Sequence, residues 1–87
     1  MGNPTIISCQ ISYYPLNTKE VDEEVRKVIN IIKASPLEHE SNPLSTIIYG
    51  EADKVYSLLE EITEKMNEDN SEFSMAINIS NSCGCDL

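Results

Sequence analysis

The sequence contains no long apolar run, and its first residues do not resemble a signal peptide. A membrane-spanning helix needs roughly 18 consecutive apolar residues, and no segment reaches that length. Residues 1–7 lack both the basic region and the long apolar region of a secretory leader. The sequence therefore predicts a cytoplasmic protein with no membrane partner.

Basic residues are also scarce: six Lys and Arg stand against 15 Asp and Glu, which gives a formal net charge of -9. A chain this acidic repels phosphate backbones, so nucleic acid is not expected as a partner. Cationic ligands or basic proteins are favoured instead. Most of the acidic residues fall on predicted helices, where they also serve as solvated faces that keep the protein soluble.

Residues that carry catalytic chemistry are few. His39 is the single histidine, and it lies between two glutamates without a nearby cysteine or a third orienting group. The chain has three glycines and contains neither a glycine-rich phosphate loop nor a helical His-Glu metal motif. We therefore expect a protein that is not an enzyme and that uses no cofactor.

The three cysteines are Cys9, Cys83 and Cys85. An odd number without a secretion signal argues against a disulfide framework. Cys83 and Cys85, with Asp86, could bind a soft metal, and a dimer could complete a four-thiolate site. Two thiolates alone are an incomplete site, so a loop-like tail with two incidental thiols is the simpler interpretation.

The chain alternates predicted strands and helices. Period-two alternation predicts a strand over residues 5–14 that ends at Pro15. Asn17 and Glu20 have the spacing of a capping pair for a helix over 18–34. A hairpin of strands 37–40 and 44–49, ended by Gly50, comes next. A helix over 52–66, a strand over 73–80 and a loop-like tail over 81–87 complete the chain.

This order, β-α-β-β-α-β, is the split βαβ or ferredoxin-like pattern. It predicts a single α+β domain over residues 1–87, a two-layer sandwich in which both helices cover one face of a four-stranded antiparallel sheet. Cys9 falls in the apolar set of the first strand and is expected in the core. The register of the third strand stays open, because Ile48 is on one side and Ile47 on the other.

The sheet face without helices carries polar side chains that are almost free of charge. From the first and last strands these are Ser8, Gln10, Ser12, Tyr14, Ser74, Asn78 and Ser80. A face that is simply wetted by solvent usually carries Lys, Glu and Arg. The pattern therefore favours partial burial, against another copy or around a small polar ligand, over plain exposure.

Several segments together resemble a known family: residues 7–16 (ISCQISYYPL), 44–50 (LSTIIYG), 53–56 (DKVY) and 80–86 (SNSCGCD). They are similar to the YkoF-like proteins that bind thiamine or hydroxymethylpyrimidine, and to the related single-domain UPF0045 proteins. The resemblance implies a ferredoxin-like domain in an oligomer built through its sheets, acting as a carrier or sensor. YkoF-like proteins hold two such repeats, so two copies of this chain would replace them, as a homodimer or homotetramer.

Strand position and chemistry suggest a ligand set for such a molecule. A pyrimidine ring offers nitrogens and an amino group, which suit polar side chains on the strands, namely Gln10, Ser12, Ser45, Thr46 and Asn78. The thiazolium cation of thiamine suits Glu38 or a tyrosine face such as that of Tyr14. The alternative is a structural or regulatory self-association domain that binds no small molecule.

Overall fold

A computed structural model describes residues 5–42 and 45–82, and its elements follow the predicted order. They are β1 (Ile6–Leu16), α1 (Val21–Ala34), β2 (Glu38–Ser41), β3 (Thr46–Glu51), α2 (Ala52–Glu68) and β4 (Glu72–Ser80). The four strands form one antiparallel sheet in the order β2-β3-β1-β4. The predicted ferredoxin-like α+β fold is confirmed.

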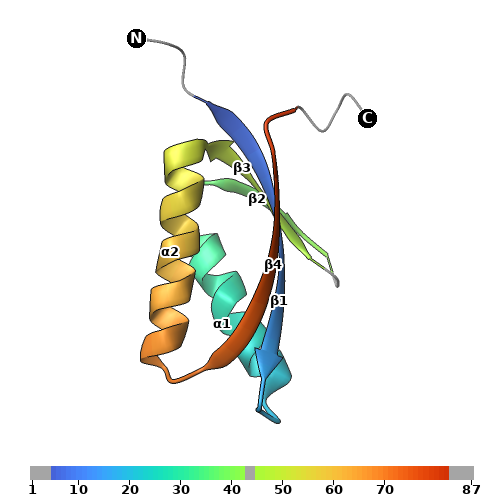
Figure 1. Ribbon diagram of the computed structural model, residues 1–87, viewed down its shortest axis with the longest axis vertical. Coiled ribbons are helices and arrows are strands. Elements are labelled where there is room, and N and C mark those ends of the chain that lie inside the picture. Colours follow the sequence, from blue (N-terminus) through green and yellow to red (C-terminus); the bar gives the residue numbers. More distant parts are fainter. Residues whose placement is uncertain (1–4, 43–44, 83–87) are drawn as a thin grey trace.

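Both helices lie on the same side of the sheet, and none of the described residues forms a helix on the other side (Figure 1). We call the covered side the inner face and the open side the outer face. None of the described residues belongs to a helix that is long and apolar enough to span a membrane.

The core lies between the inner face and the two helices. Alternate residues of β1 point into it, and the apolar stripes of α1 and α2 close over them. Its buried members are Ile7, Cys9, Ile11, Val28, Ile32, Ile48, Val55, Leu58, Ile62 and Met66. The prediction that Cys9 is a core residue is confirmed, since it is fully buried.

The start of α1 differs from the prediction. The helix begins at Val21, its N-cap is Glu20, and no side chain caps it. Asn17 instead adopts a left-handed conformation with φ 53°, and its amide donates to the Glu72 carboxylate. The predicted Asn17–Glu20 capping pair is therefore wrong, because Asn17 binds the distant start of β4 rather than the helix.

Two predicted strand ends are also wrong. β1 continues through Pro15 to Leu16, and Pro15 pairs with Phe73 of β4. The pairing of β1 with β3 ends at Ile11, so β1 has a neighbour on one side only at Pro15. A proline is tolerated at such a position because no ladder donor is required there.

Gly50 does not end β3, which runs on to Glu51. Gly50 pairs with Ile7, and a Cβ atom built on it would lie 2.6 Å from Leu37 Cδ2. The glycine thus allows Leu37 to pack close against the sheet. The register of β3 is settled by the same pairing: Ile48 faces the core opposite Cys9, and Ile47 and Tyr49 belong to the outer face.

Candidate functional site

Two cross-strand rows form the centre of the outer face. In the first row, Glu40 pairs with Ile47, Ile47 with Gln10, and Gln10 with Asn78. Directly opposed side chains in an antiparallel sheet have Cβ atoms about 4.5–5.5 Å apart. The row therefore brings two amide side chains together beside an apolar one, with a carboxylate at the sheet edge.

In the second row, Glu38 pairs with Tyr49, Tyr49 with Ser8, and Ser8 with Ser80. The Tyr49 hydroxyl donates to Glu40 Oε2 at 2.8 Å, which links the two rows. This hydrogen bond is the main cause that raises the pKa of Tyr49, with smaller contributions from burial and from the charges of Glu40 and Glu38. The β2 side of the outer face is therefore an acidic border with an aromatic ring.

The structure brings four of the predicted ligand residues close together. Gln10 Nε2 donates to Ser45 Oγ at 3.1 Å, although the two residues are 35 positions apart. Asn78 is the β4 neighbour of Gln10, and Ser12 is two residues farther along β1, opposite Ala76. Gln10 and Asn78 are exposed and Ser12 and Ser45 are half-buried, so this cluster combines donors and acceptors on an accessible surface.

The other three predicted residues do not join this cluster in the same way. Thr46 pairs with Ile11 and is only 5% exposed, so it belongs to the inner face. Tyr14 lies opposite Ser74, six positions along β1 from Ser8 in the row that holds Glu38, which is about 20 Å of extended strand. Glu38 borders the cluster from β2, but Tyr14 cannot share one small ligand with it.

Sequence reasoning did not find Ile47, Tyr49 and Glu40 as parts of this face. Ile47 and Ile48 are adjacent and equally apolar, so alternation alone gives no signal for which one turns inward. The pairing of β3 with β1, which sets Ile48 opposite the buried Cys9, decides the matter, and the pairing of β2 with β3 then places both glutamates on the outer face.

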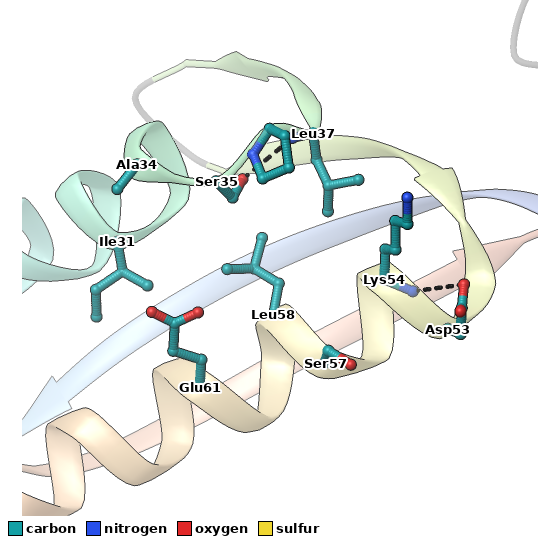
Figure 2. Close-up of a pocket in the computed structure, with 10 residues that line it drawn as sticks. Ile31, Ala34, Ser35, Leu37, Asp53, Lys54, Ser57, Leu58 and Glu61 are labelled. Carbon is teal, nitrogen blue, oxygen red and sulfur yellow. Dashed lines mark hydrogen bonds between the residues drawn. The ribbon is translucent and has the colours of Figure 1, made fainter.

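A separate cavity of about 340 Å³ lies on the helix side of the molecule, between the end of α1, the segment that follows it and the first half of α2. Figure 2 shows Ile31, Leu37 and Leu58 around it, with Asp53, Lys54 and Glu61 at its rim. This volume is in the range of small-molecule sites. The outer-face residues Gln10, Ser12, Tyr14 and Asn78 do not line it.

The charged groups at this rim already have protein partners. Lys54 Nζ is 3.2 Å from Glu51 Oε2, and Glu61 Oε2 is 2.8 Å from Lys65 Nζ. Asp53 Oδ1 accepts a hydrogen bond from the Lys54 backbone amide. The cavity thus offers mainly apolar surface, whereas the outer face offers polar groups.

Cys9 and His39, the two side chains considered for nucleophilic chemistry, lie on different strands and are not paired with each other. Cys9 is a free, buried cysteine, and burial raises the pKa of its thiol, which disfavours the nucleophilic thiolate. His39 pairs with Ile48, which in turn pairs with Cys9, so a strand separates the histidine from the thiol.

Within residues 5–42 and 45–82, no three His, Cys, Asp or Glu side chains gather as metal ligands. Cys83 and Cys85, the predicted metal-binding pair, lie outside the described residues.

The fold and the outer face together define a ferredoxin-like α+β protein with an open polar sheet face. Residues 9–85 match the model of the thiamine-binding protein family. The chain belongs to this family, as the sequence resemblance predicted. No curated protein matches the chain in sequence.

Solved structures repeat the fold. A Thermotoga maritima protein with a provisional assignment to thiamine biosynthesis or salvage has a TM-score of 0.78 at 18% identity, covering 86% of this chain and 82% of its own. A Bacillus cereus domain of unknown function, DUF77, has a TM-score of 0.78 at 22% identity, covering 91% and 80%. A hypothetical protein from Methanocaldococcus jannascii has a TM-score of 0.78 at 21% identity, covering 92% and 84%. At these identities the three structures support the fold alone.

Proposed function

We propose that this protein binds thiamine or its hydroxymethylpyrimidine precursor, without transforming it, on the outer face of an oligomer. Membership in the thiamine-binding protein family is the observation that carries this proposal. The hydrogen-bonded pair Gln10–Ser45, with Asn78 opposite Gln10, supports it on chemical grounds. The amide groups and hydroxyls match the ring nitrogens and exocyclic amine of an aminopyrimidine.

The border of the outer face supports thiamine over a neutral pyrimidine. Glu38 is exposed and directly opposes Tyr49, so a carboxylate and an aromatic ring lie together. A thiazolium cation is attracted by both groups, through charge and through the ring quadrupole. The net charge of -9 adds a general attraction for cations.

A second copy completes the site in this proposal. Within residues 5–42 and 45–82, Glu38 and Tyr49 line a hollow at the β2 side, and Ser45 lines one between β1 and α1. Neither these hollows nor the helix-side cavity is lined by Gln10, Ser12, Tyr14 or Asn78. A small ligand on a flat, exposed face gains little burial, so affinity requires a cover over the sheet. The family resemblance to two-repeat proteins suggests that another copy of this chain supplies it, in a homodimer or homotetramer.

The same flatness favours one other function, a self-association domain that binds no small molecule. A non-enzymatic role is common to both, and the buried Cys9 supports it in each case. The odd number of cysteines in the sequence, with Cys9 free, fits the reducing cytoplasm, where we place the protein.

Titration calorimetry of the full chain with thiamine and with hydroxymethylpyrimidine tests the proposal. Saturable heat with either compound is expected, with tighter binding of thiamine if Glu38 meets the cation. If an oligomeric protein gives no heat at millimolar ligand, the ligand-binding proposal is wrong and the self-association domain is the function that remains.

A Ser57→Tyr variant fills the helix-side cavity. If it abolishes binding and Gln10→Ala does not, the ligand site is that cavity and the outer-face proposal is wrong.

A further inference from the structure

The helix-side cavity of about 340 Å³ has one apolar wall that the fold holds in place. The end of α1 and the segment after it form this wall, and Ile31 and Leu37 there pack against the core. Leu58 of α2 is buried and closes the cavity on the side of the core. The remaining apolar lining comes from Ala34 and Pro36.

The opposite wall is a polar row on α2. Asp53, Ser57 and Glu61 are spaced four residues apart, so they follow one another on the same side of the helix. At a rise of about 1.5 Å per residue, Asp53 and Glu61 are separated by about 12 Å along the helix axis. Figure 2 shows the three side chains in this order along α2, with Glu61 turned toward Ile31. The cavity therefore runs along two turns of α2, between a polar row and an apolar wall.

Each carboxylate of this row keeps one oxygen without a protein partner in the described part of the chain. Asp53 Oδ1 accepts from the Lys54 amide and Glu61 Oε2 contacts Lys65 Nζ, whereas Asp53 Oδ2 and Glu61 Oε1 make no such contact. The Ser57 hydroxyl is exposed and makes no hydrogen bond to another described residue. Two acceptors of negative charge and one hydroxyl are thus open to a ligand.

From this arrangement we infer that the cavity binds a linear aliphatic polyamine. Its methylene chain would lie against the apolar wall, and its ammonium groups would donate to Asp53 Oδ2 and Glu61 Oε1. Burial of methylene groups is favourable, and a hydrogen bond between an ammonium and a carboxylate is stronger than one between neutral groups. The Ser57 hydroxyl, midway along the row, can accept from an inner amine.

Charge favours a cationic ligand over an anion. The chain has a net charge of -9, which attracts polycations and repels phosphates and carboxylates. Lys54 at the rim has the opposite charge, but Glu51 Oε2 lies 3.2 Å from its Nζ and offsets that charge.

The shape of the cavity favours an extended cation over a compact one. A single metal ion needs ligands that converge on one point, and carboxylates about 12 Å apart along a helix do not. A neutral apolar molecule would contact the wall but would leave the polar row unused. This site goes beyond the proposed function, because it is a second site, away from the outer face, for a different class of ligand.

Titration calorimetry of the full chain with spermidine tests the inference. A salt concentration of about 0.15 M is used, because charges more than about 8 Å apart are then largely screened. We expect saturable binding of one spermidine per chain. Asp53→Asn and Glu61→Gln should each weaken it about threefold, which is the effect of one exposed ion pair. Ser57→Tyr, which fills the cavity, should weaken it at least tenfold.

Glu60→Gln is the matched control. It removes the same charge as Glu61→Gln one residue away, at an exposed position that does not line the cavity, and it should bind spermidine as the wild type does. Mg²⁺ is the matched competitor, since it carries charge without an apolar chain. At a concentration equal to that of spermidine it should not displace the polyamine.

Any of four results would overturn the inference: no saturable heat with spermidine, equal weakening by Glu60→Gln and Glu61→Gln, wild-type affinity in Ser57→Tyr, or displacement by Mg²⁺. The second and fourth would assign binding to general attraction by an acidic surface. Nuclear magnetic resonance of the wild type requires no variant. Spermidine should shift the amide signals of residues 31–37 and 53–61, and shifts confined to other parts of the chain would also reject the site.

Gln10→Ala separates this site from the proposed function. It should weaken thiamine binding and leave spermidine binding unchanged, because Gln10 does not line the cavity. Loss of spermidine binding in this variant would reject the cavity as the polyamine site. A protein that binds spermidine and no thiamine would contradict the proposed function alone.

Discussion

Gln10 and Ser45 are joined across the β1–β3 boundary by a hydrogen bond of 3.1 Å from Gln10 Nε2 to Ser45 Oγ. This contact fixes the orientation of an otherwise exposed amide on the outer face. It leaves the Gln10 carbonyl oxygen to accept from an exocyclic amine and the Ser45 hydroxyl to donate to a ring nitrogen. The pair is thus the polar centre of the proposed ligand site.

Replacing Gln10 by Ala should weaken thiamine binding by about tenfold, because loss of one or two hydrogen bonds corresponds to about 1.4 kcal/mol. Ser45→Ala should weaken it less, since the Gln10 amide then remains. Titration calorimetry measures both constants, and Ser74→Ala, a same-face control opposite Tyr14, should bind as the wild type does. Equal affinity of all three variants would show that the ligand does not contact this part of the sheet.

The sequence was sufficient for the parts of the fold that depend on periodicity. Alternation in β1 and the helical spacing of Val55, Leu58 and Ile62 predicted the core correctly. The sequence-based predictions were wrong at residues whose hydrogen-bond partner or sheet face depends on contacts with distant parts of the chain. Asn17 has cap chemistry but binds Glu72, and Thr46 is polar but faces inward because its neighbour in the sheet is Ile11.

The outer face was predictable only in outline. Its uncharged residues on β1 and β4 were evident from the alternation, and the structure places them on one side. Tyr49 and the two glutamates of β2 could not be assigned to it, because two adjacent isoleucines gave β3 two possible registers. Strand alternation predicts which side chains share the outer face, but it does not predict which ligand they bind.

Asn17 holds the β1–α1 connection to the start of β4. Its Nδ2 lies 2.9 Å from Glu72 Oε2 and 3.3 Å from Oε1, and its φ is 53°. Asn17→Ala loses the hydrogen bond and places a less tolerant residue in the left-handed region, so it should lower the free energy of unfolding by about 1–2 kcal/mol. Asn17→Gly removes only the hydrogen bond and should cost less. Urea unfolding compares the two, and a glycine variant less stable than the alanine variant would contradict this account.

Tyr13 carries a hydroxyl that is buried without a hydrogen-bond partner among the described residues. Its ring stacks on Phe73 with centroids 5.2 Å apart, and burial is the main cause of its raised pKa. Because the ring contact survives in Tyr13→Phe and an unsatisfied group is removed, the free energy of unfolding should be unchanged or rise by about 1 kcal/mol. Tyr49→Phe is the matched comparison and should be slightly destabilising, since Tyr49 donates to Glu40. A loss of more than 1 kcal/mol in Tyr13→Phe would indicate a partner for that hydroxyl.

Glu24 connects α1 to the segment between α2 and β4. Lys27 Nζ lies 2.9 Å from Glu24 Oε2, and the Ser71 hydroxyl donates to Glu24 Oε1. The hydrogen bond from Lys27 is the main cause that lowers the pKa of Glu24, followed by the one from Ser71. Lys27 also contacts Asp69 at 3.3 Å, so a single lysine serves two carboxylates.

A lowered pKa in the folded state means that the folded protein binds the Glu24 proton less readily than the unfolded chain does. The stabilisation is therefore complete above the ordinary glutamate pKa and is lost as the pH falls through the lowered value, between about pH 5 and pH 2. Nuclear magnetic resonance titration should show the Glu24 pKa below the usual range in the wild type and raised by Lys27→Met. Glu24→Gln should flatten the dependence of the melting temperature on pH across this window. Glu23→Gln, an equal charge change one residue away, should leave that dependence nearly intact, and equal flattening in both variants would assign the effect to net charge instead of to the Glu24 contacts.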